Sequence, residues 1–345
     1  MKFSLRATSA TDQTALAQFL VRVFEVRADA PFVKPAVMAW KYWDRRADWT
    51  EPRSYVLEQD DTIVAHAGLW PMTFLEGGKA VRGVQMIDWA SAREAPGAGL
   101  ALCQRLSAMF DFIYSIGGSE QTQKVLPAFG FKEYGRQWRA ACPLRPTGQI
   151  LTHQYRNWKL APRLARNWLW SIRGGSPHPK WEAKEISPEQ ILPDSYSSDG
   201  LNAVFSPRPP AYFEYLARCP VARFRLYGIF QAGEPRGHFA IAVVQGQARI
   251  ACVWLHQPTQ DAWAAAYFLA RRIARTQKEA CEIVVAGCGK DSRIGAAQAG
   301  FRMMGGPAVY LLDKKKNLRL SPDFQFQLSD DDEAFLDTGS SCYWT

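Results

Sequence analysis

The sequence predicts an α/β protein in which a mixed sheet flanked by helices occurs twice in tandem. Three observations support this fold class. The chain of 345 residues is longer than one hydrophobic core usually supports, which favours two domains. Its 47% hydrophobic and 22% charged residues are typical of a globular protein. A pattern of residues in the first half also returns in the second half, followed by the same order of strands and helices.

The internal repeat relates residues 39–70 to residues 212–243 and continues beyond them. Four pairs of identical residues recur in the same order, with offsets that fall slowly from 173 to 170 residues. These pairs are Tyr42 and Tyr215, Tyr55 and Tyr227, His66 and His238, and Gly130 and Gly300. A shared order with drifting offsets indicates two copies of one fold.

The first copy begins with a helix at residues 12–26, where apolar side chains recur at helical spacing. Residues 54–70 alternate polar and apolar side chains on both sides of a polar turn, which predicts two paired strands. Residues 84–91 form an apolar strand that leads into a glycine-containing loop and a helix. A strand at 110–117 and a helix at 119–130 follow, and a last strand completes the copy.

Two residues mark the ends of the helix at 119–130. Ser119 can cap its first N–H groups, and Gly130 can end it because glycine tolerates a left-handed conformation. The second copy repeats the order of elements of the first. Its segments are the hairpin 224–244, the central strand 248–255, the long helix 259–277, the strand 281–288 and the last helix 291–301.

The loop REAPGAGLAL, residues 93–102, lies between a predicted strand and a predicted helix. Glycine lets backbone N–H groups approach an anion without an intervening Cβ, and a helix N-terminus offers unpaired N–H groups. Arg93 and Arg105 would add positive charge. A tight turn without a ligand is the alternative interpretation. The residues expected to bind a pyrophosphate are Gly97, Ala98, Gly99 and Leu100.

This order of elements resembles the GNAT acyltransferase superfamily, in which such a loop binds the pyrophosphate of acyl-coenzyme A. The family's loop reads Arg or Gln, two residues, Gly, one residue, then Gly or Ala. In the frame from Glu94 to Gly99 the two small positions match, whereas the basic first position does not. Phe129–Phe131 matches the family's Gly-Phe turn. The resemblance covers nearly the whole chain as two copies.

The resemblance implies acetyl-CoA or another acyl-CoA as co-substrate, no metal, and a small-molecule amine or sugar amine as acceptor. Only the first copy is expected to bind the coenzyme, because the corresponding loop of the second, residues 256–265, contains no glycine. The second copy would complete the substrate groove or pack against the first. Backbone N–H groups of the family's central strand face the thioester. The resemblance therefore implies that Trp89, Ala90 and Ser91 contact the coenzyme.

Asp88 is the only carboxylate in the central strand. A buried aspartate among apolar residues has a raised pKa and can act as a base, directly or through water. The alternative is an aspartate held by a neighbouring arginine or by a backbone N–H group. Asp88 is therefore a candidate catalytic residue with two open interpretations.

The family often places a tyrosine, as general acid, four residues before the glycine of the Gly-Phe turn. That position is Leu126 in the first copy and Ala296 in the second, and neither side chain donates a proton. Three options follow: an unprotonated thiolate leaves, another tyrosine substitutes, or the chain is not catalytic. For Glu120 and His66 a surface or structural role is the simpler interpretation. Candidates near the predicted cleft are Tyr114, Tyr134, Glu120 and His66.

Two further segments carry hypotheses about partners. Residues 155–173, wound as a helix from Pro162, place Leu164, Trp168 and Ile172 on one side. A basic amphipathic helix with tryptophan can lie on an anionic membrane, but an interdomain helix with its apolar side packed on a domain is favoured.

Residues 324–345 contain a run of four acidic residues, which predicts a solvated acidic end. Folded over the cleft, this tail would bind a cationic amine.

These patterns divide the chain into a domain with the coenzyme loop at residues 1–148, a linker at 149–185 and a degenerate domain at 186–345. Seven separated cysteines without a C-x-x-C pair argue against a disulfide framework or structural zinc. A polar N-terminus and the lack of a membrane-spanning apolar run favour a cytoplasmic protein.

The predicted function is acyl-CoA-dependent N-acyl transfer to an amine. One alternative resembles the Fem-type transferases, which also have two GNAT-like copies but take an aminoacyl-tRNA donor and a cell-wall precursor. Another is a non-catalytic binding or scaffold protein in polysaccharide or envelope biosynthesis. The net charge of +9 suits any anionic partner. General nucleic-acid binding is disfavoured, because the sequence contains no recognition-helix or zinc motif.

Overall fold

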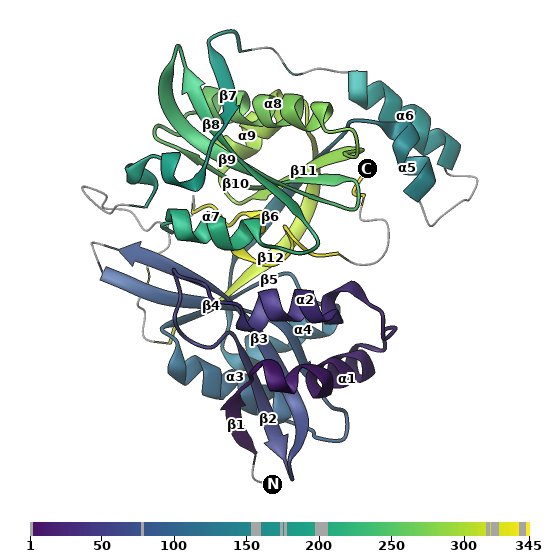
Figure 1. Ribbon diagram of the computed structural model, residues 1–345, viewed down its shortest axis with the longest axis vertical. Coiled ribbons are helices and arrows are strands. Elements are labelled where there is room, and N and C mark those ends of the chain that lie inside the picture. The colour runs from purple at the N-terminus through teal and green to yellow at the C-terminus, as the bar shows by residue number, and fades with distance from the viewer. Residues whose placement is uncertain are drawn as a thin grey trace.

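The computed structural model describes residues 3–76, 79–152, 160–172, 175, 178–196, 206–314, 318, 324–337 and 343–345. The strands of this part form one continuous mixed sheet that runs through both halves of the molecule (Figure 1). From one edge to the other the order is β1 (Ser4–Ala7), β2 (Ser54–Gln59), β3 (Thr62–Glu76), β4 (Lys79–Ser91), β5 (Phe112–Ile116), β12 (Arg302–Leu312), β6 (Lys132–Pro143), β11 (Glu282–Gly287), β10 (Gln247–Leu255), β9 (Glu234–Val244), β8 (Arg223–Gln231) and β7 (Trp181–Glu185).

Helices cover both halves of the sheet (Figure 1). The α-helices are α1 (Gln13–Phe24), α2 (Pro35–Met38), α3 (Ala98–Met109), α4 (Glu120–Val125), α5 (Pro146–Thr152), α6 (Leu160–Ile172), α7 (Pro210–Ala217), α8 (Gln260–Thr276) and α9 (Lys290–Gln298). The π-helical turn η3 (Ala39–Trp43) continues α2. Short 3₁₀ turns are η1 (Ala10–Asp12), η2 (Pro31–Val33), η4 (Pro127–Phe129), η5 (Pro188–Gln190), η6 (Pro193–Ser195) and η7 (Leu328–Asp330). None of the described helices is long and apolar enough to cross a membrane.

The structure confirms the tandem repeat. The hairpin β2–β3 corresponds to β8–β9, and the repeated histidines His66 and His238 occupy the second strand of each hairpin, fully buried. Gly130 and Gly300 end the last helix of each copy with φ of +89° and +87°. Only glycine adopts this left-handed conformation at little cost, which explains why both copies carry it. The cap predicted for Ser119 is also present, because its side chain accepts a hydrogen bond from the Thr122 N–H.

The last strand of each copy lies in the half formed by the other copy. β6 follows α4 in the chain, yet it pairs with β11, with Cys142 opposite Ile283. β12 follows α9, yet it pairs with β5, with Val309 opposite Ile116. The two exchanged strands also pair with each other. Each half of the sheet is therefore completed by backbone from the other half.

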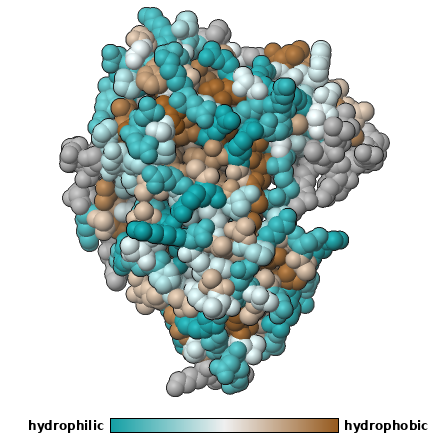
Figure 2. All heavy atoms as spheres, in the orientation of Figure 1, coloured by the Kyte–Doolittle hydropathy of each residue, from teal (hydrophilic) through white to brown (hydrophobic). Residues whose placement is uncertain are grey.

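The acidic C-terminal segment, residues 324–337, is not a solvated tail. Asp330 and Asp331 are 2% and 4% exposed, and Phe335 packs into the core between the halves. Arg208 lies 2.5 Å from the Asp330 carboxylate, and this pair is buried with it. Hydrophobic burial and a paired charge hold the segment against the sheet, so the predicted solvated end was wrong. On the face in Figure 2, hydrophilic residues predominate and the apolar groups are small and separate.

Candidate active site

The central strand β4 parts from β5 halfway along its length. Their parallel pairing runs from Gly83 opposite Phe112 to Gln85 opposite Tyr114. Beyond Gln85, β4 continues to Ser91 with pairing only to β3 among the described residues. The outer part of β4 therefore leaves one row of backbone groups without a strand partner. Such a row can hydrogen-bond a ligand that enters between the strands.

A bulge at Asp88 bends β4 where it has left β5. Asp88 has φ of +48°, and the register against β3 shifts between His66 and Gly68. A non-glycine residue in this region stores strain, so surrounding contacts must hold it. His66 supplies one contact, because its Nδ1 lies 3.0 Å from the Asp88 carbonyl oxygen. Its Nε2 lies 3.0 Å from the Ser54 hydroxyl.

Burial lowers the pKa of His66 to about 4, so the ring is neutral at pH 7. A neutral ring carries one N–H, and the carbonyl at Nδ1 requires that proton there. The hydrogen-bond pattern therefore fixes the tautomer: Nδ1–H donates to Asp88, and Ser54 donates to Nε2. His66 has the structural role that the sequence favoured.

The Asp88 carboxylate is held by two neighbours from η3. Lys41 Nζ lies 2.5 Å from it, and the Tyr42 hydroxyl donates to it at 2.6 Å. Burial by itself disfavours the carboxylate charge, but the Lys41 ammonium and the two hydrogen bonds outweigh burial and lower the pKa of Asp88. Of the two interpretations left open by the sequence, the structure fits an aspartate held by a cationic neighbour and not one with a raised pKa, and that neighbour is Lys41.

Lys41 joins this carboxylate to the C-terminal segment. Its Nζ lies 2.7 Å from Asp332, and its side chain is only 2% exposed. Burial disfavours the ammonium charge, but the charges of Asp332 and Asp88 outweigh it and raise the pKa of Lys41. Tyr42 stays protonated, since burial raises its pKa well above the ordinary value. No sequence pattern singles out Lys41, whereas Asp332 appears only within the acidic run and Tyr42 only within the repeat.

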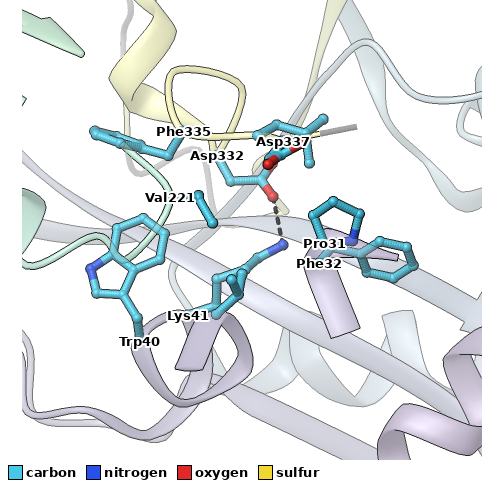
Figure 3. Close-up of a pocket in the computed structure, with 10 residues that line it drawn as sticks. Pro31, Phe32, Trp40, Lys41, Val221, Asp332, Phe335 and Asp337 are labelled. Carbon is cyan, nitrogen blue, oxygen red and sulfur yellow. Dashed lines mark hydrogen bonds and ion pairs between the residues drawn. The ribbon is translucent and has the colours of Figure 1, made fainter. Parts of the chain in front are cut away.

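A small cavity opens beside the Lys41–Asp332 ion pair (Figure 3). One wall comes from η2 and α2, and the other from the C-terminal segment. Two carboxylates, Asp332 and Asp337, face a single cation, Lys41, among the lining residues. The cavity is lined by Pro31, Phe32, Val37, Trp40, Lys41, Val221, Asp332, Phe335, Leu336 and Asp337.

The glycine loop follows β4 and begins α3. Gly97 is the N-cap of α3 with φ of +84°, and a Cβ there would meet no atom within 4 Å. A Cβ on the buried Gly99 would lie 3.2 Å from the Ser91 hydroxyl oxygen. Gly97 therefore keeps the loop open, and Gly99 lets α3 approach β4 closely. Ala98 is buried and Leu100 is half-buried.

The two arginines predicted near the loop have different neighbours. Arg93 is exposed and pairs with Glu25 at 2.7 Å. Arg105 Nη2 donates to the Phe3 carbonyl instead, at 2.8 Å. Trp89 packs edge-on against Phe129, with 5.8 Å between the ring centroids. Its indole nitrogen is buried without a partner among the described residues.

The remaining predicted residues lie as follows. Ala90 is buried opposite His66, and Ser91 is half-buried. Tyr114 is fully buried and donates to the Asp330 carbonyl at 2.5 Å, and burial raises its pKa well above the ordinary value. Glu120 is exposed at the start of α4. The structure thus brings Asp88 and the loop to the outer end of β4 and ties Tyr114 to the C-terminal segment.

No protein-family model matches the sequence. No curated protein matches it either.

Solved structures match over most of the chain, at low sequence identity. A GCN5-related N-acetyltransferase from Anabaena variabilis is 12% identical, with a TM-score of 0.57, over 90% of this chain and 73% of its own. An N-myristoyltransferase from Saccharomyces cerevisiae is 11% identical, with a TM-score of 0.56, over 90% of this chain and 80% of its own. A tandem GNAT protein from the clavulanic acid biosynthesis pathway is 13% identical, with a TM-score of 0.53, over 90% of this chain and 98% of its own. The chain therefore has the GNAT N-acetyltransferase fold, repeated in two tandem copies.

Proposed function

We propose that this protein is an acyl-CoA-dependent N-acyltransferase that modifies a small-molecule amine, with acetyl-CoA as the first donor to test. The observation that carries the proposal is the meeting of three features at one end of β4. The strand leaves β5, a bulge bends it at Asp88, and a glycine loop begins a helix directly after it. A donor and an acceptor can meet there.

The loop fits the pyrophosphate of a coenzyme. Gly97 is exposed, and the space where its Cβ would lie is open. The N–H groups of Gly99 and Leu100 belong to the first turn of α3, where intrahelical acceptors are lacking. They would donate to phosphate oxygens, and the helix dipole favours an anion at this end. Arg93 would add charge once it left Glu25.

The coenzyme supplies the acyl group as a thioester. With the thioester against the outer part of β4, unpaired backbone N–H groups near Trp89 and Ala90 would stabilise the oxyanion of the addition step. The ammonium first releases one proton to solvent, and the neutral amine nitrogen then bonds to the carbonyl carbon, the carbon–sulfur bond breaks, and a thiolate leaves. The nitrogen releases its second proton and the thiolate takes up a proton from solvent, so that an amide and a free thiol result.

The acceptor amine would bind beside Asp88, where β4 has left β5 and its outer backbone groups have no strand partner among the described residues. Because Lys41 holds Asp88 ionised, we assign Asp88 to attract and orient the amine. A carboxylate with a lowered pKa is a poor proton acceptor.

Calorimetric titration with acetyl-CoA tests the donor site, using wild type and Gly97→Glu. We expect saturable binding at one site in the wild type, and none in Gly97→Glu because a carboxylate would occupy the phosphate position. Gly233→Glu is the matched control, since Gly233 has φ of +86° and equally open surroundings in the β8–β9 turn. This control should bind acetyl-CoA as the wild type does.

Two results would contradict the proposal. Equal affinity of wild type and Gly97→Glu would show that the loop is only a turn. Absence of binding in a folded wild type would favour an aminoacyl-tRNA donor or a non-catalytic role instead.

A further inference from the structure

The helix α6 is oriented opposite to an ordinary surface helix. A surface helix buries its apolar side chains and exposes its polar ones. In α6, Asn167 and Ser171 are buried, whereas Trp168, Leu169 and Ile172 are 58%, 50% and 61% exposed. Ala161 and Ala165 continue the exposed stripe at helical spacing. The helix projects at the edge of the second half, near the C-terminus (Figure 1).

The sequence favours an interdomain helix whose apolar side packs on a domain over a helix that lies on a membrane. The structure instead turns Trp168 and Ile172 toward solvent. The reason lies in the polar side of the helix. Asn167 donates to the Gln149 side chain at 2.9 Å, and the Ser171 carbonyl accepts from Arg271 at 3.3 Å and also from Arg275.

These bonds fix the rotation of α6 about its own axis. Reversing it would leave a buried amide and a helix-terminal carbonyl without partners, at a cost comparable to burying apolar surface. The exposed apolar stripe is thus a stable feature of the folded chain. An exposed apolar stripe of this kind indicates a surface that binds a partner through apolar contacts.

The charge on α6 indicates which partner. Arg163 and Arg166 belong to this helix, and the sequence segment 134–181 that contains it has nine lysines and arginines and no aspartate or glutamate, although Arg139 in β6 is paired with Glu333. Arg166 lies exposed on α6, and its guanidinium carbon is 4.3 Å from the centre of the Trp170 ring. Arg302 contacts the same ring at 4.7 Å. An anionic surface would complement this face.

We propose that α6 docks this protein on an anionic lipid bilayer. Trp168, Leu169 and Ile172 would enter the boundary between headgroups and acyl chains, while the surrounding arginines contact anionic headgroups. Tryptophan favours this depth because its ring is apolar and its N–H is polar. The helix lies flat on the bilayer and does not cross it.

Two other occupants fit less well. A second copy of the chain would bury three large side chains and two alanines on each side, well short of the roughly 800 Å² per partner of stable interfaces. A nucleic acid would use the arginines but leave the apolar stripe in water. Only a lipid surface uses both features.

Flotation with vesicles tests the proposal on the full chain. One set of vesicles is phosphatidylcholine alone, and the other contains about 30% phosphatidylglycerol, which supplies the negative surface charge. We expect the protein to float with the anionic vesicles only, and less so as salt is raised. The variant Trp168→Ala/Leu169→Ala/Ile172→Ala should reduce the bound fraction about tenfold or more, because the inserted apolar surface is lost.

The matched control is Met109→Ala/Val125→Ala, which removes two exposed apolar side chains from the first half. It should float like the wild type. Circular dichroism should show that both variants are folded, since the replaced side chains are exposed.

Depth is measured with brominated lipids. These lipids should quench part of the tryptophan fluorescence of the wild type. Trp168→Phe should still float, but brominated lipids should no longer quench that share of its fluorescence.

Four results would overturn the proposal. Failure of the wild type to float would exclude lipid docking. Undiminished flotation of the triple variant would show that the stripe is not used. A wild-type dimer in light scattering that the triple variant converts to a monomer would assign the stripe to a second copy. Binding to poly-uridylate in preference to anionic vesicles would assign the arginines to nucleic acid.

Discussion

Lys41 shows how much one buried charge decides at the candidate site. It lies within hydrogen-bond distance of both Asp88 and Asp332, two residues that are far apart in the chain. A sequence pattern identifies Asp88 as unusual because it interrupts an apolar strand. The same pattern does not decide the direction of its pKa shift, since that direction depends on a lysine 47 residues away.

Replacing Lys41 by methionine should destabilise the protein strongly. Two partly buried carboxylates would remain without the buried lysine between them, and removing one partner of a buried ion pair costs about 3–5 kcal/mol. The pKa values of these carboxylates would rise above those of the unfolded chain, so the folded variant binds protons as the pH is lowered from 7 toward 5. The free energy of unfolding lost relative to the wild type should therefore shrink over this range. Urea unfolding at both pH values measures this.

The exposed Lys34 in the same region provides the control. Lys34→Met should change the free energy of unfolding little at either pH. A Lys41→Met variant as stable as this control would show that Lys41 does not compensate the two carboxylates.

At the scale of elements, the sequence predicted the positions of helices and strands better than it predicted which face of each element packs against the protein and which faces solvent. The left-handed conformation of Gly130 was predicted correctly, because it is a local property of the backbone. The orientation of α6 was wrong because distant partners such as Arg271 fix it. Local signals report conformation, and contacts over long distances along the chain decide orientation.

The packing of α8 on α9 gives a prediction at this scale. A Cβ on Gly295 of α9 would lie 2.8 Å from the backbone nitrogen of Ala264 in α8. Because the backbone of a packed helix cannot move aside without disturbing its neighbours, Gly295→Ala should lower the free energy of unfolding by about 1–3 kcal/mol through overpacking. Gly135→Ala is the control, because a Cβ there meets no atom within 4 Å. Equal melting temperatures for both variants would contradict the close approach of the two helices.

At the scale of the whole molecule, the exchange of β6 and β12 should make the two halves unfold as one unit. A fragment of residues 1–148 would lack β12 and β11, which leaves one edge of β5 and both edges of β6 unpaired. Such edges aggregate and their unpaired backbone is costly. We expect this fragment to show no cooperative urea transition, whereas the full chain shows a single one. A cooperative transition in the fragment would mean that the first copy folds without the exchanged strand.

The repeated histidines predict how stability depends on pH. Burial lowers the pKa of His66 to about 4 and that of His238 to about 3, whereas the unfolded chain has ordinary values near 6.5. Below pH 6.5 the unfolded state binds more protons, so stability falls as the pH drops from 6.5 toward 4. At pH 5 each histidine should cost about 2 kcal/mol relative to pH 7.

Urea unfolding at pH 7 and pH 5 measures this dependence. The double variant His66→Gln/His238→Gln should lose stability at pH 7, because buried contacts change, but depend less on pH. An equally steep pH dependence in this variant would assign the effect to other groups.

The sequence by itself determined that the chain holds two copies of one α/β unit, and where the glycine loop, the capped helix and the left-handed turns lie. These features depend on periodicity and on the backbone freedom of single residues, which neighbouring residues in the chain reveal. Only the tertiary structure decided that the last strands exchange halves, that the acidic segment is buried, that Lys41 keeps Asp88 ionised and that α6 turns its apolar side outward. Each of these depends on pairing between residues distant in the chain, where burial and charge act on groups that no local pattern connects.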